Sequence, residues 1–314
     1  MADQLTPAAL VGVQAAVALG AVVVLPLGLR LLASTGAAPV PRPRSWAWPL
    51  AGACAVVALL LPRGPLAVAL SVPFALVAAV LLVTAAGAWL SPARRRGSSD
   101  LAVATGLVTT AVGAFALLAD RRGATVLGFD GDILLLTVPH MLFAGFGACL
   151  AAGLAARAEQ GGPSRLARAG AAGVTLGVLA VLGGYLVSDE AELVGTVVLT
   201  AGVWCATAAA WRAARRQADA DASRTASRWA AVWAGVALLG SVVAMLLALW
   251  WAAGEVTDVV HPDLSWMVAT HGALNALAVV LGSLVALRLR TTGSPPGSDA
   301  GPRARRGLAA GGAA

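Results

Sequence analysis

Residues 66–90 read LAVALSVPFALVAAVLLVTAAGAWL, a run without one charged side chain. A transmembrane helix needs about 20 predominantly apolar residues to cross ~30 Å of hydrocarbon. Similar runs recur along the 314-residue chain, of which 59% is hydrophobic and only 12% charged, with a mean hydropathy of +0.83. A soluble domain is nearer half apolar and a quarter charged. The sequence therefore predicts an all-α, polytopic transmembrane helix bundle, because a β-barrel would show alternating segments of about ten residues instead.

The uncharged runs predict about nine spans. Most of them exceed the length that a bilayer requires. The second is short and is bounded by Pro49 and Pro62. The predicted spans are 8–32, 46–61, 66–90, 100–119, 133–156, 166–188, 191–211, 229–253 and 265–287.

The distribution of the 22 basic residues, all arginine, predicts the orientation of the bundle. If the N-terminus and every second loop lie on one side, that side holds Arg63, Arg121 and Arg122, and the other side holds all the rest. The positive-inside rule then places the N-terminus outside and the C-terminus in the cytoplasm. Asp3 is the only early charge and no basic segment precedes the first apolar run, so we expect no cleavable signal peptide. We expect a multi-pass protein of the plasma (inner) membrane.

We expect residues 1–290 to form a single transmembrane helical domain and residues 291–314, rich in Gly, Pro, Ser and Ala, to form a disordered cytoplasmic tail. The polar loop 212–228 predicts a short surface helix. Small residues in stripes predict close helix contacts. The stripes are Gly12–Ala16–Gly20, Gly145–Cys149–Gly153, Gly173–Gly177 and Gly272–Ala276, and the prolines that interrupt spans are Pro26, Pro73 and Pro139.

Composition and motifs exclude several functions. The net charge of +7 comes from arginines in loops, so the expected partner is the lipid bilayer and not nucleic acid. Cys54, Cys149 and Cys205 lie in different apolar runs, a spacing that builds neither a disulfide framework nor a zinc site. The chain has no phosphate-binding loop, no His-Glu-x-x-His and no nucleophile–base constellation, so we name no catalytic residue and disfavour an enzyme.

Two of the three histidines lie inside apolar runs. His140 is about seven residues into the fifth predicted span and His271 about six residues into the ninth, which places them ~10 Å and ~9 Å deep at 1.5 Å per residue. Both spans enter from the predicted outer side, so the two imidazoles are expected at matching depth. Ionisable residues within membrane spans are costly and often functional. The third histidine, His261, lies in an acidic outer loop that could fold over the site.

Each of these spans also presents small polar neighbours. Thr137 shares a face with His140, and Asn275 shares a face with His271. Thr270 and Gly272 flank His271 directly. We therefore expect these six residues to line one cavity in the outer half of the bundle. His140 and His271 are also candidate metal or haem ligands, since neutral imidazole binds iron, copper and zinc.

The two histidine segments resemble the YndJ-like family of bacterial membrane proteins. That family carries a central His-Phe-His-Tyr-Ala-Gly-Phe stretch, which stands here as residues 140–146, HMLFAGF, and a late Thr-His-Gly-x-x-Asn-Ala stretch, which stands here as residues 270–276, THGALNA. Phe129-Asp130 is also similar to the family. The second central histidine falls on Leu142 and the tyrosine on Phe143, so a site that needs both central histidines would be incomplete. The resemblance implies a polytopic membrane protein that is sometimes labelled a transporter.

Three hypotheses remain open from the sequence. The protein is a transporter-like body with a polar cavity for a small solute, or a haem- or transition-metal-binding membrane protein that uses His140 and His271 as ligands, or a structural or partner-binding protein without a ligand. No Asp, Glu or Arg lies mid-span, which disfavours ion-coupled transport. The sequence sets neither the cofactor nor the oligomeric state.

Overall fold

The computed structural model describes residues 5–35, 46–90, 97–159, 162–221, 224–257 and 259–292. These residues form helices, with one isolated bridge between Val126 and Phe129. The predicted tail lies outside the described residues from position 293 on. The elements, with η marking a π-helical segment, are α1 (Pro7–Ala18), η1 (Leu19–Val24), α2 (Leu25–Thr35), α3 (Ala47–Leu60), α4 (Pro65–Leu90), α5 (Ser98–Arg122), α6 (Gly131–His140), η2 (Met141–Ala148), α7 (Cys149–Arg157), α8 (Arg165–Gly184), α9 (Asp189–Ala220), α10 (Thr225–Thr257), α11 (Leu264–Met267), η3 (Val268–Gly272), η4 (Asn275–Leu281) and α12 (Gly282–Thr292).

Eight of the described helices are long and apolar enough to cross a membrane, with 7–35, 131–157 and 264–291 each continuous through their π-helical segments. This confirms the prediction of a multi-pass helical bundle. The predicted second span differs from the others, because α3 has only 14 residues. At 1.5 Å per residue it is about 21 Å long, less than the ~30 Å of a hydrocarbon core.

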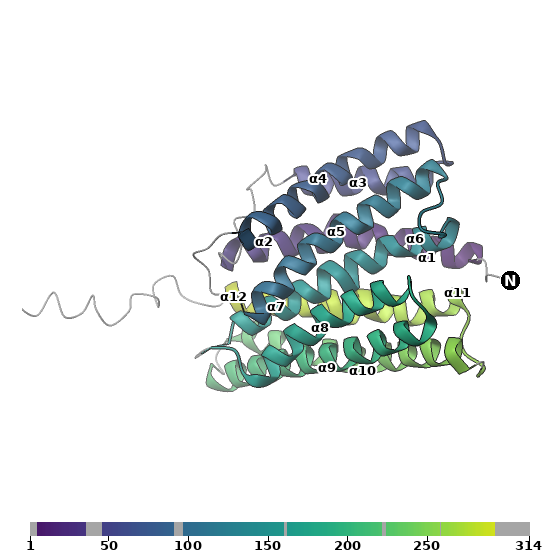
Figure 1. Ribbon diagram of the computed structural model, residues 1–314. Helices are drawn as coiled ribbons and strands as arrows, with labels where there is room; N and C mark the ends of the chain where they lie inside the picture. Colours follow the sequence, from purple (N-terminus) through teal and green to yellow (C-terminus); the bar gives the residue numbers. More distant parts are fainter. Residues whose placement is uncertain are drawn as a thin grey trace, which may run out of the picture.

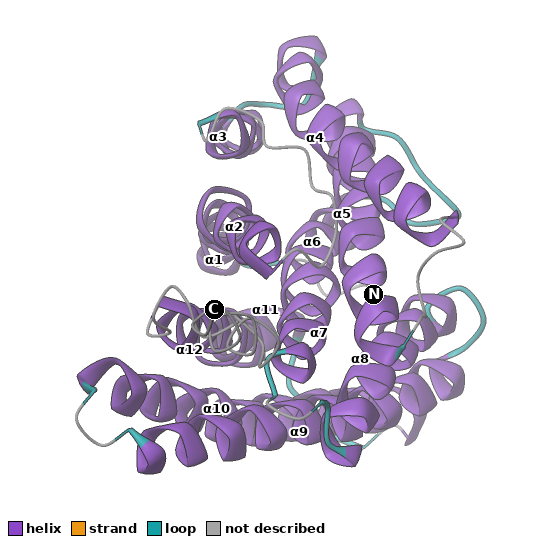
Figure 2. Cartoon of the chain, turned by 90° about the vertical axis from the view of Figure 1, so that its left-hand side faces the viewer, coloured by secondary structure: helices purple, strands orange, loops and turns teal. Residues whose placement is uncertain are grey.

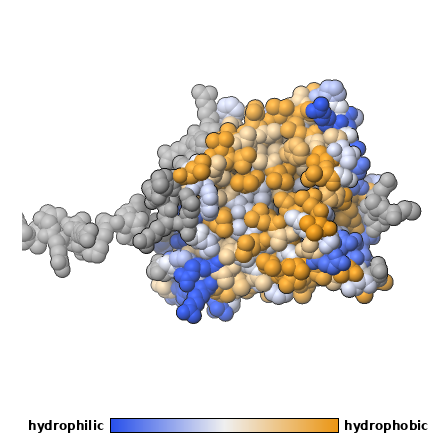
Figure 3. Space-filling view, in the orientation of Figure 1, coloured by the Kyte–Doolittle hydropathy of each residue, from blue (hydrophilic) through white to orange (hydrophobic). Residues whose placement is uncertain are grey.

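The surface of the bundle fits a lipid environment. In Figure 3 hydrophobic residues cover the middle of the molecule and hydrophilic residues gather towards its two ends. Many large apolar side chains are exposed on the outward faces of the helices, including Leu66, Val83 and Leu239 at 64%, 71% and 71%. An apolar exposed belt of this size would be costly in water and is expected against acyl chains.

The first, fifth and ninth predicted spans form the centre of the molecule. Helices α3, α4 and α5 pack on one side of them and α8, α9 and α10 on the other (Figures 1 and 2). We call the end where α1, α6 and α11 begin the N-terminal end, and the end where α2, α7 and α12 finish the arginine-rich end. The three central spans run side by side between these two ends (Figure 1).

Backbone hydrogen bonds tie the three central spans together at the N-terminal end. The Leu5 N–H donates to Oδ2 of Asp132 at 2.9 Å, and the Thr6 N–H donates to Oγ of Ser265 at 2.9 Å. Asp132 lies in the first turn of α6 and Ser265 in α11. The Thr6 hydroxyl in turn accepts from the Ala9 N–H and caps α1. The start of the first span therefore fixes the entry of both histidine-bearing spans.

Further along the three central spans, glycines let neighbouring helices approach each other closely. A Cβ built on Gly20 would lie 2.9 Å from Cδ1 of Leu142, and one built on Gly147 would lie 2.4 Å from Cγ1 of Val280. Gly12 faces Val268, Gly145 faces Thr109 and Gly177 faces Leu199, so most of the predicted small-residue stripes lie at helix contacts. Gly272 is an exception. A Cβ there would meet only the Met267 carbonyl oxygen of its own span, at an ordinary 3.6 Å, so Gly272 does not stand at a close contact between helices.

The polar stretch 212–228 does not form a separate surface helix. Helix α9 continues to Ala220 and α10 begins at Thr225, so the stretch belongs to the ends of two long helices. Arg224 pairs with Asp221 at 2.9 Å in the short turn between them. Both helices continue past the apolar belt, because backbone hydrogen bonds hold a helix together whether or not its side chains are apolar. The long arginine side chains there keep their charges in water.

Candidate functional site

His140 and His271 stand at irregular points of their helices. His140 ends α6, directly after Pro139, and the next eight residues form the π-helical segment η2. His271 lies inside η3, and Asn275 begins η4. π-helical turns are rare and frequently occur at functional sites. Segments η1, η2 and η4 contact one another, so the three central spans meet at their irregular segments.

The His140 imidazole is held by its own helix. Its Nδ1 lies 3.0 Å from the Leu136 carbonyl oxygen, one turn earlier. By surface area the residue is exposed. His140 is therefore accessible and does not lie in a packed core.

The His271 imidazole is held by a neighbouring helix. Its Nδ1 lies 2.8 Å from the carbonyl oxygen of Ala244 in α10, and the side chain is half-buried. The two imidazoles lie within electrostatic range of each other. Helix α1 contacts both α6 and η3, so the first span borders the same region. His140 and His271 therefore lie on spans that contact each other through η2 and η4.

The hydrogen bonds determine which ring nitrogen is available. A carbonyl oxygen only accepts, so Nδ1 carries the proton in His140 and in His271. In the neutral ring Nε2 then keeps its lone pair. Neither Nε2 has a hydrogen-bond partner among the described residues. Each imidazole therefore offers one free acceptor or ligand atom.

The remaining predicted site residues divide into two groups. The hydroxyls of Thr137 and Thr270 donate to carbonyls one turn back in their own helices, Ile133 at 2.8 Å and Trp266 at 2.8 Å. These hydroxyls can still accept but no longer donate. The half-buried Asn275 amide makes no hydrogen bond to the described residues, and Gly272 is half-buried without a close contact to another helix. Asn275 is therefore the free polar side chain of the set.

His261 belongs to a different cluster at the N-terminal end. Its Nε2 lies 3.2 Å from Oε1 of Glu255, and its ring packs edge-on against Trp251 at 6.4 Å. A Cβ on Gly254 would lie 2.4 Å from the His261 ring, so the loop after α10 folds back tightly on that helix. His261 is thus engaged with its own loop, unlike the two histidines in the spans.

Acidic side chains gather near this loop. Tyr185, just after α8, packs edge-on against Phe129 at 6.3 Å. Burial raises the pKa of the Tyr185 hydroxyl, and the negative charges of Glu192, Glu255 and Asp189 raise it further. The end of α8, the start of α9 and the end of α10 therefore share one negatively charged region at the N-terminal end.

The comparison with protein families covers both histidine segments. A family model described as YndJ-like protein matches residues 15–279. The chain belongs to the YndJ-like family. No curated protein and no solved structure matches this YndJ-like protein.

The two positions where this YndJ-like protein departs from the central motif are packing positions. Leu142 and Phe143 are only 1% and 4% exposed, and both lie against Gly20 of the first span. They stand after His140, inside η2, and face the contact between spans. An imidazole at position 142 would therefore meet the first span in this fold.

Sequence reasoning missed the π-helical segments and the carbonyl of Ala244. Pro26 follows η1 and Pro139 precedes η2, but the ninth span has no proline beside η3 and η4. Pro73 lies in α4, which stays α-helical throughout. Proline is thus an incomplete signal of these segments, and no residue pattern marks the Ala244 carbonyl.

Proposed function

We propose that this YndJ-like membrane protein binds a small polar solute at His140 and His271, in a permease-like body. The free Nε2 atoms of two backbone-anchored imidazoles carry this proposal, because both border the same region of the bundle. Anchoring through Nδ1 fixes the ring orientation, so each Nε2 accepts a hydrogen bond from a donor on the solute. Polar groups in a membrane interior are otherwise paired.

Asn275 completes the proposed solute site. Its amide can donate and accept, whereas the two Nε2 atoms only accept. It lies one turn beyond His271 and has no partner among the described residues. A solute with both donors and acceptors, such as an amide, a polyol or a zwitterion, matches this set. The N-terminus outside, the C-terminus in the cytoplasm and nine crossings are part of the same proposal, with the site in the outer half.

A transition metal or haem is the second candidate ligand. Histidines that bind metals commonly donate their other ring N–H to a carbonyl, the arrangement that both His140 and His271 show. Among the described residues no group of three His, Cys, Asp or Glu side chains could hold a metal ion. A metal here would therefore rely on two imidazoles, a set suited to copper, zinc or haem iron.

The test compares histidine variants in purified protein. Thermal shifts are measured in detergent with a panel of amides, polyols and zwitterions, and separately with Zn²⁺, Cu⁺ and hemin. His140→Leu and His271→Leu should each abolish ligand-induced stabilisation. His261→Leu is the matched control, because this histidine lies at the same end but binds Glu255. If all three variants keep the full shift, or if no probe stabilises the native protein, ligand binding at the pair is wrong.

Asn275→Leu separates the two candidate ligands. An amide is a poor transition-metal ligand, so the variant should weaken solute binding about tenfold or more by loss of a hydrogen bond to a polar group, while metal or haem binding persists. A Soret band that survives Asn275→Leu and disappears in His271→Leu would replace the solute proposal with the haem one.

A further inference from the structure

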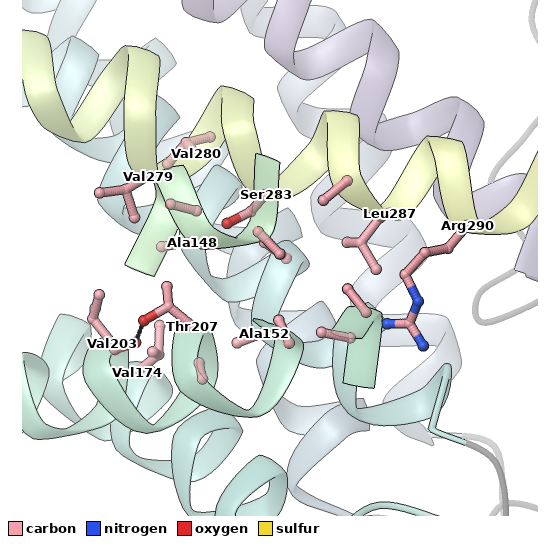
Figure 4. Close-up of a pocket in the computed structure, with 18 residues that line it drawn as sticks. Ala148, Ala152, Val174, Val203, Thr207, Val279, Val280, Ser283, Leu287 and Arg290 are labelled. Carbon is pink, nitrogen blue, oxygen red and sulfur yellow. Dashed lines mark hydrogen bonds between the residues drawn. The ribbon is translucent and has the colours of Figure 1, made fainter. Parts of the chain in front are cut away.

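A second feature lies towards the arginine-rich end, away from the histidines. A narrow, partly open cavity lies between η2, α7, α8, α9, α10, η4 and α12 (Figure 4). Ten of its 18 lining residues are alanines, so the walls are apolar and the space is narrow. Arg290 stands at one end of this cavity, with its side chain directed inward from α12 (Figure 4).

The charge of Arg290 is buried without a direct ion pair among the described residues. The residue is only 9% exposed. Its Nε donates to Oε1 of Gln217 at 2.9 Å and its Nη2 to the Ala158 carbonyl at 3.3 Å, and both acceptors are neutral. Among the described residues no carboxylate lies within ion-pair distance of it, and Nη1 makes no hydrogen bond. A buried charge is costly unless it is paired, so this guanidinium is poised for an anion.

The nearest electrostatic partners do not supply that anion. Glu159 lies within electrostatic range of Arg290, but its two carboxylate oxygens accept from the Ser164 N–H at 2.6 Å and the Ser164 hydroxyl at 3.3 Å. Arg216 lies within the same range and adds positive charge. The site therefore combines a cation that has no direct ion pair among the described residues with an apolar slot beside it.

We propose that this slot binds an anionic lipid from the leaflet at the arginine-rich end, with its phosphate on Arg290 and one acyl chain along the alanine walls. A free phosphate would neutralise the guanidinium but leave the apolar slot empty. An amphiphile satisfies both parts, and basic pockets between transmembrane helices recognise anionic headgroups in this way. Ser283 and Thr207 are the polar side chains further along the slot (Figure 4).

The test measures thermal unfolding in detergent micelles doped with phosphatidylglycerol, with phosphatidylcholine or with inorganic phosphate. Phosphatidylglycerol should raise the melting temperature by on the order of 5 °C at saturation, and the other two additives should not. Native mass spectrometry should show one retained anionic lipid. An equal shift with phosphate would mean that a free anion suffices, and the lipid proposal would be overturned.

Variants separate the two parts of the site. Arg290→Gln should abolish the phosphatidylglycerol shift. Ser283→Leu keeps the cation but fills the slot, so it should also reduce the shift, and it serves as the test if Arg290→Gln does not fold. Arg212→Gln is the control, because it removes one exposed arginine of α9 at the same end. A shift that Arg212→Gln reduces as much as Arg290→Gln, or that both site variants keep, would contradict the proposal.

Discussion

Asp120 lies in the last turn of α5, at the N-terminal end of the bundle. Its carboxylate is fully buried and accepts from Nε of Arg121 at 2.7 Å and from Nη2 of Arg63 at 2.8 Å. Arg121 is itself buried and also donates to the carbonyls of Ala58 and Leu61 at the end of α3. The cluster therefore links the ends of α3 and α5 through a charge pair that water barely reaches.

We predict that Asp120→Asn lowers the free energy of unfolding by about 3–5 kcal/mol, because it leaves the buried Arg121 guanidinium without its counter-charge. Thermal or denaturant unfolding in detergent measures the change. Arg63→Gln is the comparison, since the Arg63 side chain is 50% exposed and its loss should cost about 1 kcal/mol or less. Equal losses in the two variants would show that burial of the pair is not what matters.

Leu127 is the residue whose backbone is strained. It has a φ of 53° and Gly128 a φ of 88°, and the two form the centre of a tight turn between the paired residues Val126 and Phe129. Positive φ at both central positions favours Asn-Gly, whereas a leucine there is disfavoured by its Cβ. The Leu127 side chain is 75% exposed, so its packing contributes little stability to offset the backbone strain.

We predict that Leu127→Asn stabilises the protein by about 0.5–1 kcal/mol, because asparagine tolerates the left-handed backbone. The midpoint of thermal unfolding is the measurement. Leu127→Ala removes the same exposed side chain but keeps the strained backbone, so it should give no gain. Stabilisation by alanine as large as that by asparagine would assign the effect to the exposed leucine and not to φ.

Helices α8 and α9 form the closest contact at the scale of elements. A Cβ on Gly177 would lie 2.3 Å from Cα of Leu199, and one on Gly202 would lie 2.3 Å from the Gly173 carbonyl carbon. These contacts are with backbone atoms, which cannot move aside as a side chain end can. In lipid such small residues bring helices together, because no hydrophobic force between helices does so.

We predict that Gly177→Ala lowers the free energy of unfolding by at least about 2 kcal/mol through overpacking of the α8–α9 contact. Gly87→Ala in α4 is the control. A Cβ there meets nothing within 4 Å, so the gain in helix propensity should make it neutral or slightly stabilising. Chemical denaturation followed by helical circular dichroism compares the two. If Gly177→Ala is tolerated as well as Gly87→Ala, the two helices separate more easily than this packing indicates.

The sequence predicts the long elements well and their ends poorly. Uncharged runs mark the eight long spans because hydropathy measures lipid contact directly. The same measure fails at Arg212–Ala220, where α9 continues as a polar helix, and at α5, where the predicted span stops at 119 and omits the buried pair Asp120–Arg121. A hydropathy profile assigns charged residues to loops, even where they form the last turns of a helix or are buried against a neighbouring helix.

The candidate site was also only partly predictable from the sequence. The histidines stand out from the sequence because ionisable residues are rare in apolar runs, and the structure places their spans in contact. The sequence could not show that Nδ1 of His271 meets the Ala244 carbonyl of another helix, because any helix offers a carbonyl at that depth. It also could not show that Gly177 stands at a close contact between helices while Gly272 does not, since both are glycines in similar stripes.

At the scale of the whole molecule, the two proposed sites share the ninth span. His271 and Asn275 lie in its first half, and Arg290 lies close to its end. The first half is bound to the first span through Thr6 and Ser265, and the second half lines the alanine-rich cavity. A solute site near one membrane face and a lipid site near the other would therefore act on the same helix.

The path of the chain makes the crossing of α3 a decisive question. The first helix begins at the N-terminal end and α12 finishes at the arginine-rich end, so the two lie on opposite faces (Figure 1). If these two ends face opposite sides of a membrane, the number of crossings is odd, although only eight described helices reach membrane length. The ninth crossing would then fall to α3, which has 14 residues and packs closely on the first span, since a Cβ on Gly52 would lie 2.5 Å from the Ala21 carbonyl oxygen.

We predict that Ser34 and Pro62, which flank α3, face opposite sides of the membrane. Single cysteines at these exposed positions, in a background without Cys54, Cys149 and Cys205, are treated with a membrane-impermeant maleimide in intact cells and after lysis. Pro62→Cys should react in intact cells and Ser34→Cys only after lysis, because the arginine bias places the end that holds Ser34 in the cytoplasm. Thr125→Cys and Ala220→Cys, at the two ends of other helices, provide the matching outside and inside controls. If Ser34→Cys and Pro62→Cys react alike, α3 does not cross, and the positions of the two termini on opposite faces would have to be abandoned with it.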